Sequence, residues 1–253
     1  MECNLSEYYI ERLSVTRSTN SYARENAAAL WEAAGNAAIV AVCADEQTEG
    51  RGQRGNVWQS GAGENLLVSL MVRPRALAVS SQFLLSQAIA LAVRAAVAFL
   101  GSDVQIKWPN DIYADGRKLA GILVELDCCG AFVGNAVIGV GLNVNQTLFE
   151  PMDKVPVSMK MLQGRDLEID EVLAALLDAF SYYFSLLERG DGHLVAEEYK
   201  RRLMGRGQVM RYRASGEEFD ARIKDVLPCG HLQLERLCGT VSQYAFKEVE
   251  LLL

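Results

Sequence analysis

Histidine is nearly absent from this chain, with His193 and His231 as its two copies among 253 residues. Neither histidine stands near a nucleophile motif or at the spacing of metal ligands. The patterns G-x-S-x-G, H-E-x-x-H and C-x-x-C and the Walker A sequence are missing as well. These absences argue against histidine-activated hydrolases, common zinc enzymes and P-loop nucleotide binding.

An excess of positive charge is also lacking, because the formal net charge is −7. This value argues against a nucleic-acid partner such as DNA held by phosphate contacts. Six cysteines are present without the spacing of a disulfide framework: Cys3, Cys43, Cys128, Cys129, Cys229 and Cys238. Reduced thiols and an N-terminus without an apolar signal segment predict a cytoplasmic protein.

One apolar stretch, residues 83–100, approaches the composition of a membrane span. Ser86, Gln87 and Arg94 interrupt it. A buried helix therefore explains the stretch better than a span does, and no membrane partner is expected.

The apolar patterns predict an α+β fold. Strands are expected at residues 8–13, 38–44, 66–72, 104–106, 118–125 and 131–140. Helices are expected after a cap at Ser18 or Thr19, at residues 83–100, after a cap at Asp170, and up to about residue 204. Asp115-Gly116 is a hairpin signal. The resulting architecture is a mixed or antiparallel sheet with helices packed on one face.

The period changes to two after Gly205, where Phe219, Ala221 and Ile223 alternate with polar residues. Such short strands between glycine turns predict a small β-barrel of roughly fifty residues. We therefore expect a domain of residues 1–204 and a second domain of residues 205–253.

The stretch from Gly50 to Trp58, GRGQRGNVW, stands out as a candidate ligand loop. Three glycines allow close approach of the backbone, two arginines offer forked cationic donors, and the tryptophan adds a flat apolar face. The letters also fit G-x-G-x-x-G, but a strand-like run follows instead of a helix, which excludes a Rossmann turn. A mobile loop that folds over a small anionic ligand is predicted, with a plain surface loop as the alternative.

Four motifs together resemble the motif series of biotin protein ligases: GRGQRGNVW at 50–58, KWPNDIY at 107–113, KLAGILVE at 118–125 and GVGLNVN at 139–145. Their order and spacing match, and the β-rich tail resembles that family's C-terminal SH3-like barrel. The resemblance covers nearly the whole chain. Within that family, the chain resembles the monofunctional type without an N-terminal DNA-binding domain. It implies that biotin and ATP are joined as biotinyl-5′-AMP and that biotin passes to one lysine of a carrier domain.

The resemblance also implies roles for single residues. Ser18, Thr19 and Gln47 would hydrogen-bond the ureido ring of biotin, and Lys107 would bridge the biotin carboxylate and the α-phosphate as the key catalytic cation, together with Arg51. The implied biotin-binding set is Ser18, Thr19, Asn20, Gln47, Gly50, Arg51, Gly52, Gln53, Trp58, Lys107, Gly121, Gly139 and Gly141. The implied ATP-binding set is Arg51, Gln53, Arg54, Trp58, Lys107, Asn110 and Asn143, with Asn143 near Mg²⁺.

Two positions depart from the family pattern. Gln53 and Asn56 stand where the best-known members carry arginine. Retention of the adenylate or affinity for the nucleotide is therefore expected to differ, with Arg54 as a candidate for compensation.

Several alternatives remain at this stage. A lipoate or octanoate ligase or transferase of the related fold would need no polar partners such as Ser18 and Gln47. A biotin-responsive repressor would need a DNA-binding domain before the motifs that begin near Ser18. A binding module without catalysis would have lost Lys107 or the glycine loop, and both are present. The expected partner is the biotin carboxyl carrier protein of a biotin-dependent carboxylase, and the sheet could offer an edge for a homodimer.

Overall fold

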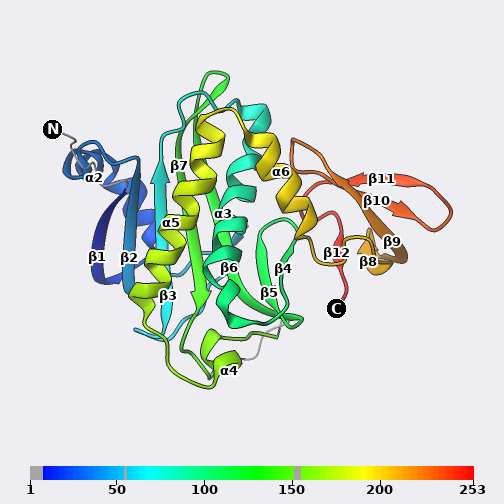
Figure 1. Cartoon of the computed structure of the whole chain (residues 1–253), viewed down its shortest axis with the longest axis horizontal. Helices are drawn as coiled ribbons and strands as arrows, with labels where there is room; N and C mark the ends of the chain where they lie inside the picture. The colour runs from blue at the N-terminus through cyan, green and yellow to red at the C-terminus, as the bar shows by residue number, and fades with distance from the viewer. Residues whose placement is uncertain (1–7, 54–55, 151–154) are drawn as a thin grey trace.

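The computed structural model describes residues 8–53, 56–150 and 155–253. A seven-stranded mixed sheet forms the centre of the molecule (Figure 1). In spatial order its strands are β1 (Tyr8–Thr16), β2 (Ile39–Gln47), β3 (Asn65–Val72), β7 (Phe132–Asn143), β6 (Arg117–Cys129), β5 (Asp111–Ala114) and β4 (Val104–Lys107). β1 and β2 are parallel, and the other neighbours are antiparallel. The predicted α+β class with a mixed sheet is confirmed.

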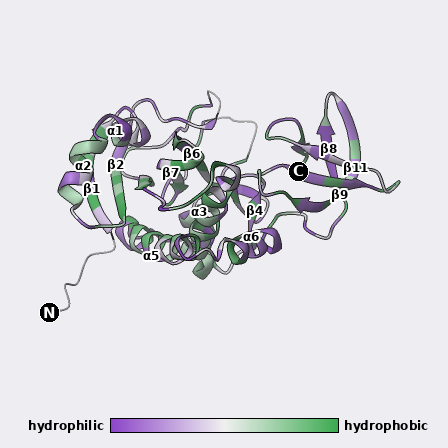
Figure 2. Cartoon of the chain, turned by 90° about the horizontal axis from the view of Figure 1, so that it is seen from above, coloured by the Kyte–Doolittle hydropathy of each residue, from purple (hydrophilic) through white to green (hydrophobic). Residues whose placement is uncertain are grey.

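Helices cover both faces of this sheet, so the prediction of helices on one face is wrong. α3 (Phe83–Ala96), α5 (Ile169–Glu188) and α6 (Gly192–Arg201) pack together over one face. α1 (Thr19–Glu25) and α2 (Ala27–Ala34) lie on the opposite side of β1 and β2 (Figure 2). The reason is that β2 and β3 are apolar on both faces: Val40, Val42 and Met71 join the core beneath α1 and α2.

Two predicted helices differ in the structure: one begins at another residue, and one is divided in two. α5 begins after Glu168, so Asp170 lies in its first turn and pairs with Arg12 instead of capping the helix. The single helix expected after Ser18 is divided into α1 and α2 at Asn26, whose side chain donates to the carbonyl of Tyr22. A side chain that bonds back to the preceding turn competes with helix propagation.

The apolar segment Val79–Leu100 is the one part of the described chain long and apolar enough to cross a membrane, judged by length and composition. It comprises the short 3₁₀ turns Val79–Ser81 and Ala98–Leu100 and the helix α3 between them. The most apolar window of this segment is 61% buried, and α3 packs against α5, α6 and β6. Such burial is typical of a core helix.

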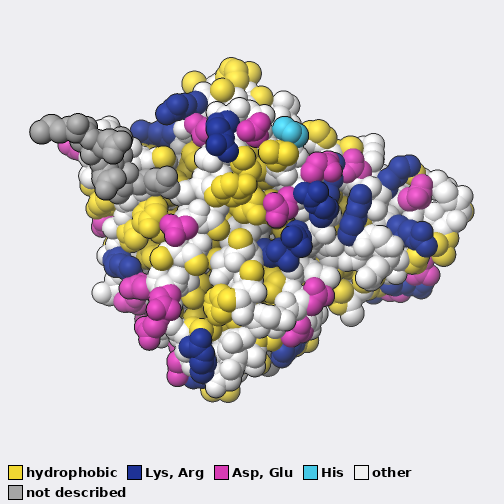
Figure 3. All heavy atoms as spheres, in the orientation of Figure 1, with side chains coloured by type: hydrophobic (Ala, Val, Ile, Leu, Met, Phe, Trp, Pro, Cys, Tyr) yellow, Lys and Arg dark blue, Asp and Glu magenta, His cyan; other side chains and the backbone are white. Residues whose placement is uncertain are grey.

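A second, smaller sheet follows α6 and the region expected to divide the domains. Its strands are β11 (Val241–Tyr244), β10 (Leu232–Arg236), β9 (Glu217–Val226), β8 (Met210–Ala214) and β12 (Glu250–Leu251), in that spatial order. Charges of both signs are interspersed over this unit (Figure 3), as in the pair Arg213–Glu218 at 2.7 Å. A small C-terminal β unit is therefore present as predicted, while the division at residue 204 stays a prediction.

Candidate active site

A cavity of about 610 Å³ lies on the face of the large sheet that carries α1. Its floor includes Gly121 of β6 and Gly139 and Gly141 of β7. These glycines share the strand parity of Val137, which faces the α1 and α2 side. The opposite parity, including Ile138 and Val140, packs in the core with α3 and α5. The alternation along β7 thus separates a core face from a site face.

One end of the cavity is a chain of hydrogen bonds from α1, β2 and β3. The backbone N–H of Thr19 donates to Oε1 of Gln47 at 2.8 Å, and its hydroxyl donates to the same oxygen at 3.1 Å. The hydroxyl of Ser69 lies within hydrogen-bond distance of Thr19 Oγ1 and Asn20 Oδ1. Ser18, Thr19 and Asn20 are each 3% exposed, so this polar end is buried. Buried polar groups with fixed partners can orient a polar ligand.

Glu125 of β6 extends this network to the glycine loop. Its Oε2 accepts from Nδ2 of Asn20 at 2.8 Å, and its Oε1 accepts from Arg51 at 3.0 Å. Arg24 also approaches Oε1, at 3.4 Å. Three of the expected biotin residues, Thr19, Asn20 and Gln47, are therefore joined to Arg51 through Ser69 and Glu125, two residues that sequence reasoning did not single out. Both residues lie in predicted strands without a distinguishing local pattern, and their hydrogen-bond partners are far away in the sequence.

The glycine loop forms a narrow antiparallel hairpin. The N–H of Trp58 donates to the carbonyl of Gly50 at 2.9 Å, and that of Gly52 donates to Asn56 at 2.7 Å. A Cβ atom at Gly50 would collide with the carbonyl of Trp58, which explains the glycine at that position. Arg54, expected to compensate for the missing arginines, lies outside the described residues, and the mobility of the loop stays a prediction.

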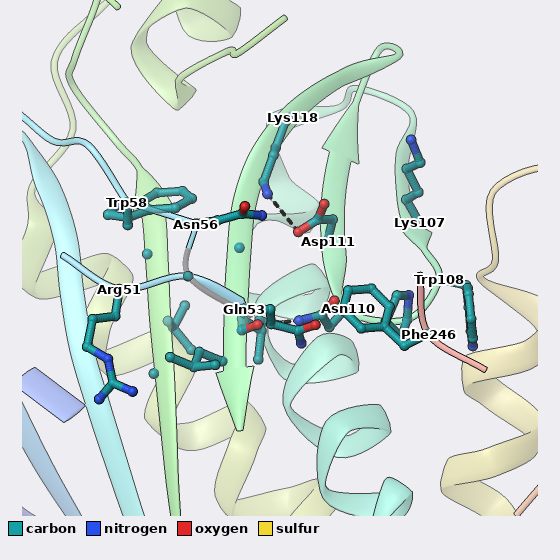
Figure 4. Close-up of a pocket in the computed structure, with 18 of the residues that line it drawn as sticks. Arg51, Gln53, Asn56, Trp58, Lys107, Trp108, Asn110, Asp111, Lys118 and Phe246 are labelled. Atoms are coloured by element: carbon teal, nitrogen blue, oxygen red, sulfur yellow. Dashed lines mark hydrogen bonds and ion pairs between the residues drawn. The ribbon is translucent and has the colours of Figure 1, made fainter. Parts of the chain in front are cut away.

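The hairpin places the Trp58 indole flat on the glycine floor (Figure 4). Gly121 and Gly141 are paired across β6 and β7, and a Cβ on Gly141 would collide with the indole, while one on Gly121 would lie 2.9 Å from Cζ3. Gly139 makes room for Asn20 in the same way. The three glycines thus accommodate side chains of this protein, whereas close approach of a ligand to their backbone stays a prediction.

Lys118 points to the middle of the cavity (Figure 4). Its Nζ lies 2.8 Å from Asp111 Oδ1 and 5.8 Å from the centre of the Trp58 ring. A register shift between Ile112 and Tyr113 pairs Asp111 with Gly121 instead of Ala120. Because of this bulge, the carboxylate of Asp111 and the open floor at Gly121 share one face. Sequence reasoning placed Lys118 at the start of the KLAGILVE motif but gave it no role of its own.

Lys107, in contrast, faces the C-terminal unit. Its Nζ donates to the carbonyl of Leu251 at 3.2 Å and lies 5.3 Å from the centre of the Tyr113 ring. The adjacent Trp108 donates from Nε1 to the carbonyl of Gly230 at 3.0 Å. Lys107 still lines the cavity, but at its edge, where the KWPND turn joins the two sheets. The role of key cation that the resemblance implies for Lys107 stays a prediction.

Two expected nucleotide residues have structural partners. Asn110, 5% exposed, donates to the carbonyl of Ile122, and the preceding Pro109 carbonyl accepts from the hydroxyl of Tyr199 at 2.7 Å. Asn143 donates to the carbonyl of Val157 at 3.0 Å. Both asparagines line the cavity while holding its walls in place.

The C-terminal unit completes the cavity with Tyr212, Phe246, Lys247, Glu250 and Leu251. The ring of Phe246 meets that of Trp108 edge to face at 6.2 Å between centroids. Two donors on the cavity wall, Trp58 Nε1 and the hydroxyl of Tyr212, are buried without a hydrogen-bond partner in the described part of the chain. Burial raises the pKa of Tyr212 to about 12, so its phenol remains a neutral donor at neutral pH. Unsatisfied donors of this kind suit a polar ligand.

The family model described as the biotin/lipoate A/B protein ligase family matches residues 13–143, just over half of the chain. The chain belongs to the biotin/lipoate protein ligase family. The match runs from the end of β1 through Asn143 of β7 and so includes the four sequence motifs up to that residue.

Relatives within this family carry biotin in their names. The chain is 35% identical over 170 residues to the biotin–[acetyl-CoA-carboxylase] ligase of Paracoccus denitrificans, which covers 64% of this chain and 70% of that protein. It is 32% identical over 211 residues to the bifunctional ligase/repressor BirA of Bacillus spizizenii, covering 81% of this chain and 64% of that one. The match to BirA of Bacillus subtilis covers 44% of that protein, so the chain matches only part of these longer relatives.

Solved structures of biotin/lipoate ligase family members share the whole fold. A biotin protein ligase from Aquifex aeolicus in complex with biotin and ATP superimposes with a TM-score of 0.77 at 22% identity, covering 96% of this chain and 97% of that one. A biotin protein ligase from Leishmania major in complex with biotinyl-5-AMP gives 0.65 at 24% identity, covering 93% and 98%. The likeness extends over both sheets and establishes the fold.

Proposed function

We propose that this protein is an ATP-dependent biotin protein ligase. It activates biotin as biotinyl-5′-AMP with release of pyrophosphate and transfers biotin to a lysine of a biotin carboxyl carrier domain. The observation that carries the proposal is one cavity with a buried polar end at Thr19 and Gln47 and a lysine, Lys118, farther along its glycine floor. The names of the relatives, biotin–[acetyl-CoA-carboxylase] ligase among them, support the choice of acid and of carrier.

The polar end suits the ureido ring of biotin. That ring offers two N–H donors and one carbonyl acceptor, so it needs partners of both kinds. Ser18, Thr19 and Gln47 provide hydroxyl and amide groups there. The indole of Trp58 and the glycine floor provide an apolar surface for the rest of the acid.

In the first half-reaction, a carboxylate oxygen of biotin attacks the α-phosphorus of ATP, and the bond to the bridging oxygen of pyrophosphate breaks. Two anions must meet, so cations that offset their repulsion lower the barrier. Our candidates for these cations are two side chains that line the cavity: Lys118 of β6 and Arg51 of the glycine hairpin. We assign the bridging role to Lys118 and a supporting role at the cavity edge to Lys107.

Mg²⁺ enters this scheme with ATP as the Mg-ATP substrate. No group of three His, Cys, Asp or Glu that could hold a metal ion occurs in residues 8–53, 56–150 and 155–253. The donor set therefore does not fit a resident metal centre. Asn143 directs its amide nitrogen to Val157 and Lys118 carbonyls, which leaves its Oδ1 as the atom that could face Mg-ATP.

In the second half-reaction, the amine of the acceptor lysine attacks the acyl carbon, AMP leaves, and the amine loses one proton. A lysine with an ordinary pKa near 10.4 requires about 4–5 kcal/mol to be neutral at pH 7. Asp111, which lines the cavity beside Lys118, is our candidate for the carboxylate that assists this proton loss.

A cytoplasmic compartment fits the described cysteines, which are all free thiols: Cys43, Cys128, Cys129, Cys229 and Cys238. A homodimer through the edge of the large sheet at β1, which pairs with no strand other than β2 among the described residues, remains part of the proposal.

Transfer to a carrier domain tests the whole proposal. The protein is incubated with Mg-ATP, a purified biotin carboxyl carrier domain, and biotin, lipoate or octanoate, and the intact mass of the carrier is measured. A mass increase with biotin alone is expected, and it should vanish when the acceptor lysine is replaced by arginine. An increase with lipoate or octanoate instead would assign the chain to the lipoate branch of the family.

A further inference from the structure

Lys247 adopts a backbone conformation that a lysine rarely adopts. Among the described residues other than glycine, three have positive φ: Asp115 (48°), Ser215 (52°) and Lys247 (72°). Asp115 and Ser215 each precede a glycine in a two-residue hairpin, where this conformation is required and these residue types are common. Lys247 has no such explanation.

The turn that contains Lys247 calls for glycine. The N–H of Glu248 donates to the carbonyl of Ala245 at 3.1 Å, which makes Lys247 the third residue of the turn. The carboxylate of Glu248 also accepts from the N–H of Ala245 at 2.7 Å and so closes the turn from the other side. A positive φ at the third position is the mark of a type II turn, where glycine or asparagine is favoured. Local structure alone therefore gives no reason for lysine.

This turn lies on the wall of the active-site cavity. Phe246, Lys247, Glu250 and Leu251 all line it, and Phe246 packs against Trp108 of the KWPND turn. The turn is thereby fixed against the catalytic sheet from the C-terminal unit. The packing of Phe246 against Trp108 therefore holds the backbone that carries the Lys247 side chain.

The other described cations of the cavity already have partners within the protein. Lys118 pairs with Asp111, Arg51 pairs with Glu125, and Lys107 donates to the carbonyl of Leu251. Lys247 is in none of the ion pairs between described residues, and its ammonium lies 6.0 Å from the centre of the Phe246 ring. The hairpin on the facing side carries the uncharged Gln53 and Asn56 at two positions that line the cavity.

We propose that Lys247 is a substrate-binding residue, which contacts the polyphosphate of ATP from the C-terminal unit and replaces the charge that Gln53 and Asn56 do not supply. The strained turn is retained because a glycine there would remove the cation. The proposal rests on the ligase function proposed above and adds a nucleotide contact from the second sheet.

The test compares Lys247→Gly with the wild-type protein. This substitution relieves the positive φ, which should stabilise the fold, and it removes the ammonium group, which should weaken ATP binding. Lys247→Gly is expected to raise the melting temperature by roughly 2–4 °C, because the positive φ becomes unstrained. The same change is expected to raise the KM for Mg-ATP by about 5- to 30-fold, while the KM for biotin stays within twofold. Lys247→Arg should retain most of the ATP affinity.

Two controls make the outcome decisive. Lys247→Ala should show the same loss of ATP affinity without the gain in stability. Lys224→Ala removes a lysine of the same unit that pairs with Glu235 at 3.5 Å outside the cavity, and it should change neither quantity. A stabilised Lys247→Gly protein with an unchanged KM for ATP would overturn the proposal. Absence of any biotin-dependent activity or ATP binding in the wild-type protein would instead overturn the proposed function itself.

Discussion

Arg51 and Glu125 form an ion pair, with 3.0 Å between Nη2 and Oε1, that joins the glycine hairpin to strand β6. The same carboxylate holds Asn20 at 2.8 Å through its second oxygen. Glu125 is therefore the point where the buried polar end of the cavity meets the glycine hairpin. A single carboxylate with two engaged oxygens couples the positions of both groups.

Glu125→Gln should weaken this coupling without unfolding the protein. The neutral amide binds Arg51 less strongly and no longer offers two anionic oxygens, so Asn20 loses its fixed orientation. We expect the KM for biotin to rise by about 5- to 20-fold in a pyrophosphate-exchange assay. Asp127→Asn is the matched control, because Asp127 contacts Arg24 at 3.4 Å and does not contact Asn20 or Arg51. Equal effects of the two substitutions would contradict the coupling.

Lys118 and Lys107 should differ when each is replaced by methionine. Lys118→Met removes the cation from the middle of the cavity and should lower kcat for adenylate formation by about 100- to 1,000-fold. Lys107→Met removes the hydrogen bond to Leu251 at the junction of the two sheets, and it should chiefly lower the melting temperature. Single-turnover formation of the adenylate separates the two effects. Loss of chemistry in Lys107→Met with normal chemistry in Lys118→Met would reverse our assignment.

Gly141→Ala should displace Trp58, because the added methyl group would collide with the indole ring. We expect a shifted tryptophan emission spectrum and a reduced affinity for biotin. Gly134→Ala lies in the same strand, where the nearest heavy atom would be 3.4 Å from the new methyl group. That control should leave both quantities unchanged and could add a few tenths of a kcal/mol of stability. An unchanged emission spectrum in Gly141→Ala would place the indole elsewhere.

Cys43 should resist thiol reagents that modify the exposed cysteines. Burial in β2 raises the pKa of its thiol from 9.0 to about 12, so the native thiol stays protonated above the pH at which the unfolded chain ionises. The contribution of the neutral Cys43 thiol to the free energy of unfolding is therefore fully present below pH 9. It is lost as the pH rises toward 12, by at most about 1.4 kcal/mol per pH unit. Denaturant titrations of wild type and Cys43→Ala at pH 8 and pH 10.5 measure this difference. An alkaline slope that is equal in both proteins would contradict it.

Much of the fold follows from the sequence, because the continuous apolar runs of β2 and β3 and the alternation of β9 are local patterns. The placement of α1 and α2 on the second face does not, since a strand that is apolar throughout does not show which element covers each side. The N-cap of α5 is Glu168, two residues before the predicted cap at Asp170. The side chain of Asp170 pairs with Arg12 instead.

The candidate site was predictable as a set of motifs but not as an arrangement. Ser18, Thr19, Gln47 and the hairpin converge as the resemblance implied. The central position of Lys118 depends on the bulge at Ile112 and Tyr113, which no local signal in the sequence marks. Ser69 and Glu125 were missed because their partners lie about 50 to 105 residues away in the chain. Phe246 and Lys247 reach the cavity only through the docking of the second sheet.

The most direct test of the central claim is pyrophosphate–ATP exchange with biotin, lipoate or octanoate as the acid. The protein should exchange pyrophosphate into ATP with biotin, at least about 100-fold faster than with either fatty acid, because a buried polar end rejects a ligand that leaves its groups unpaired. The exchange should fall to background in Lys118→Met. Exchange that is supported by octanoate or lipoate and not by biotin, or that is unchanged in Lys118→Met, would contradict the account.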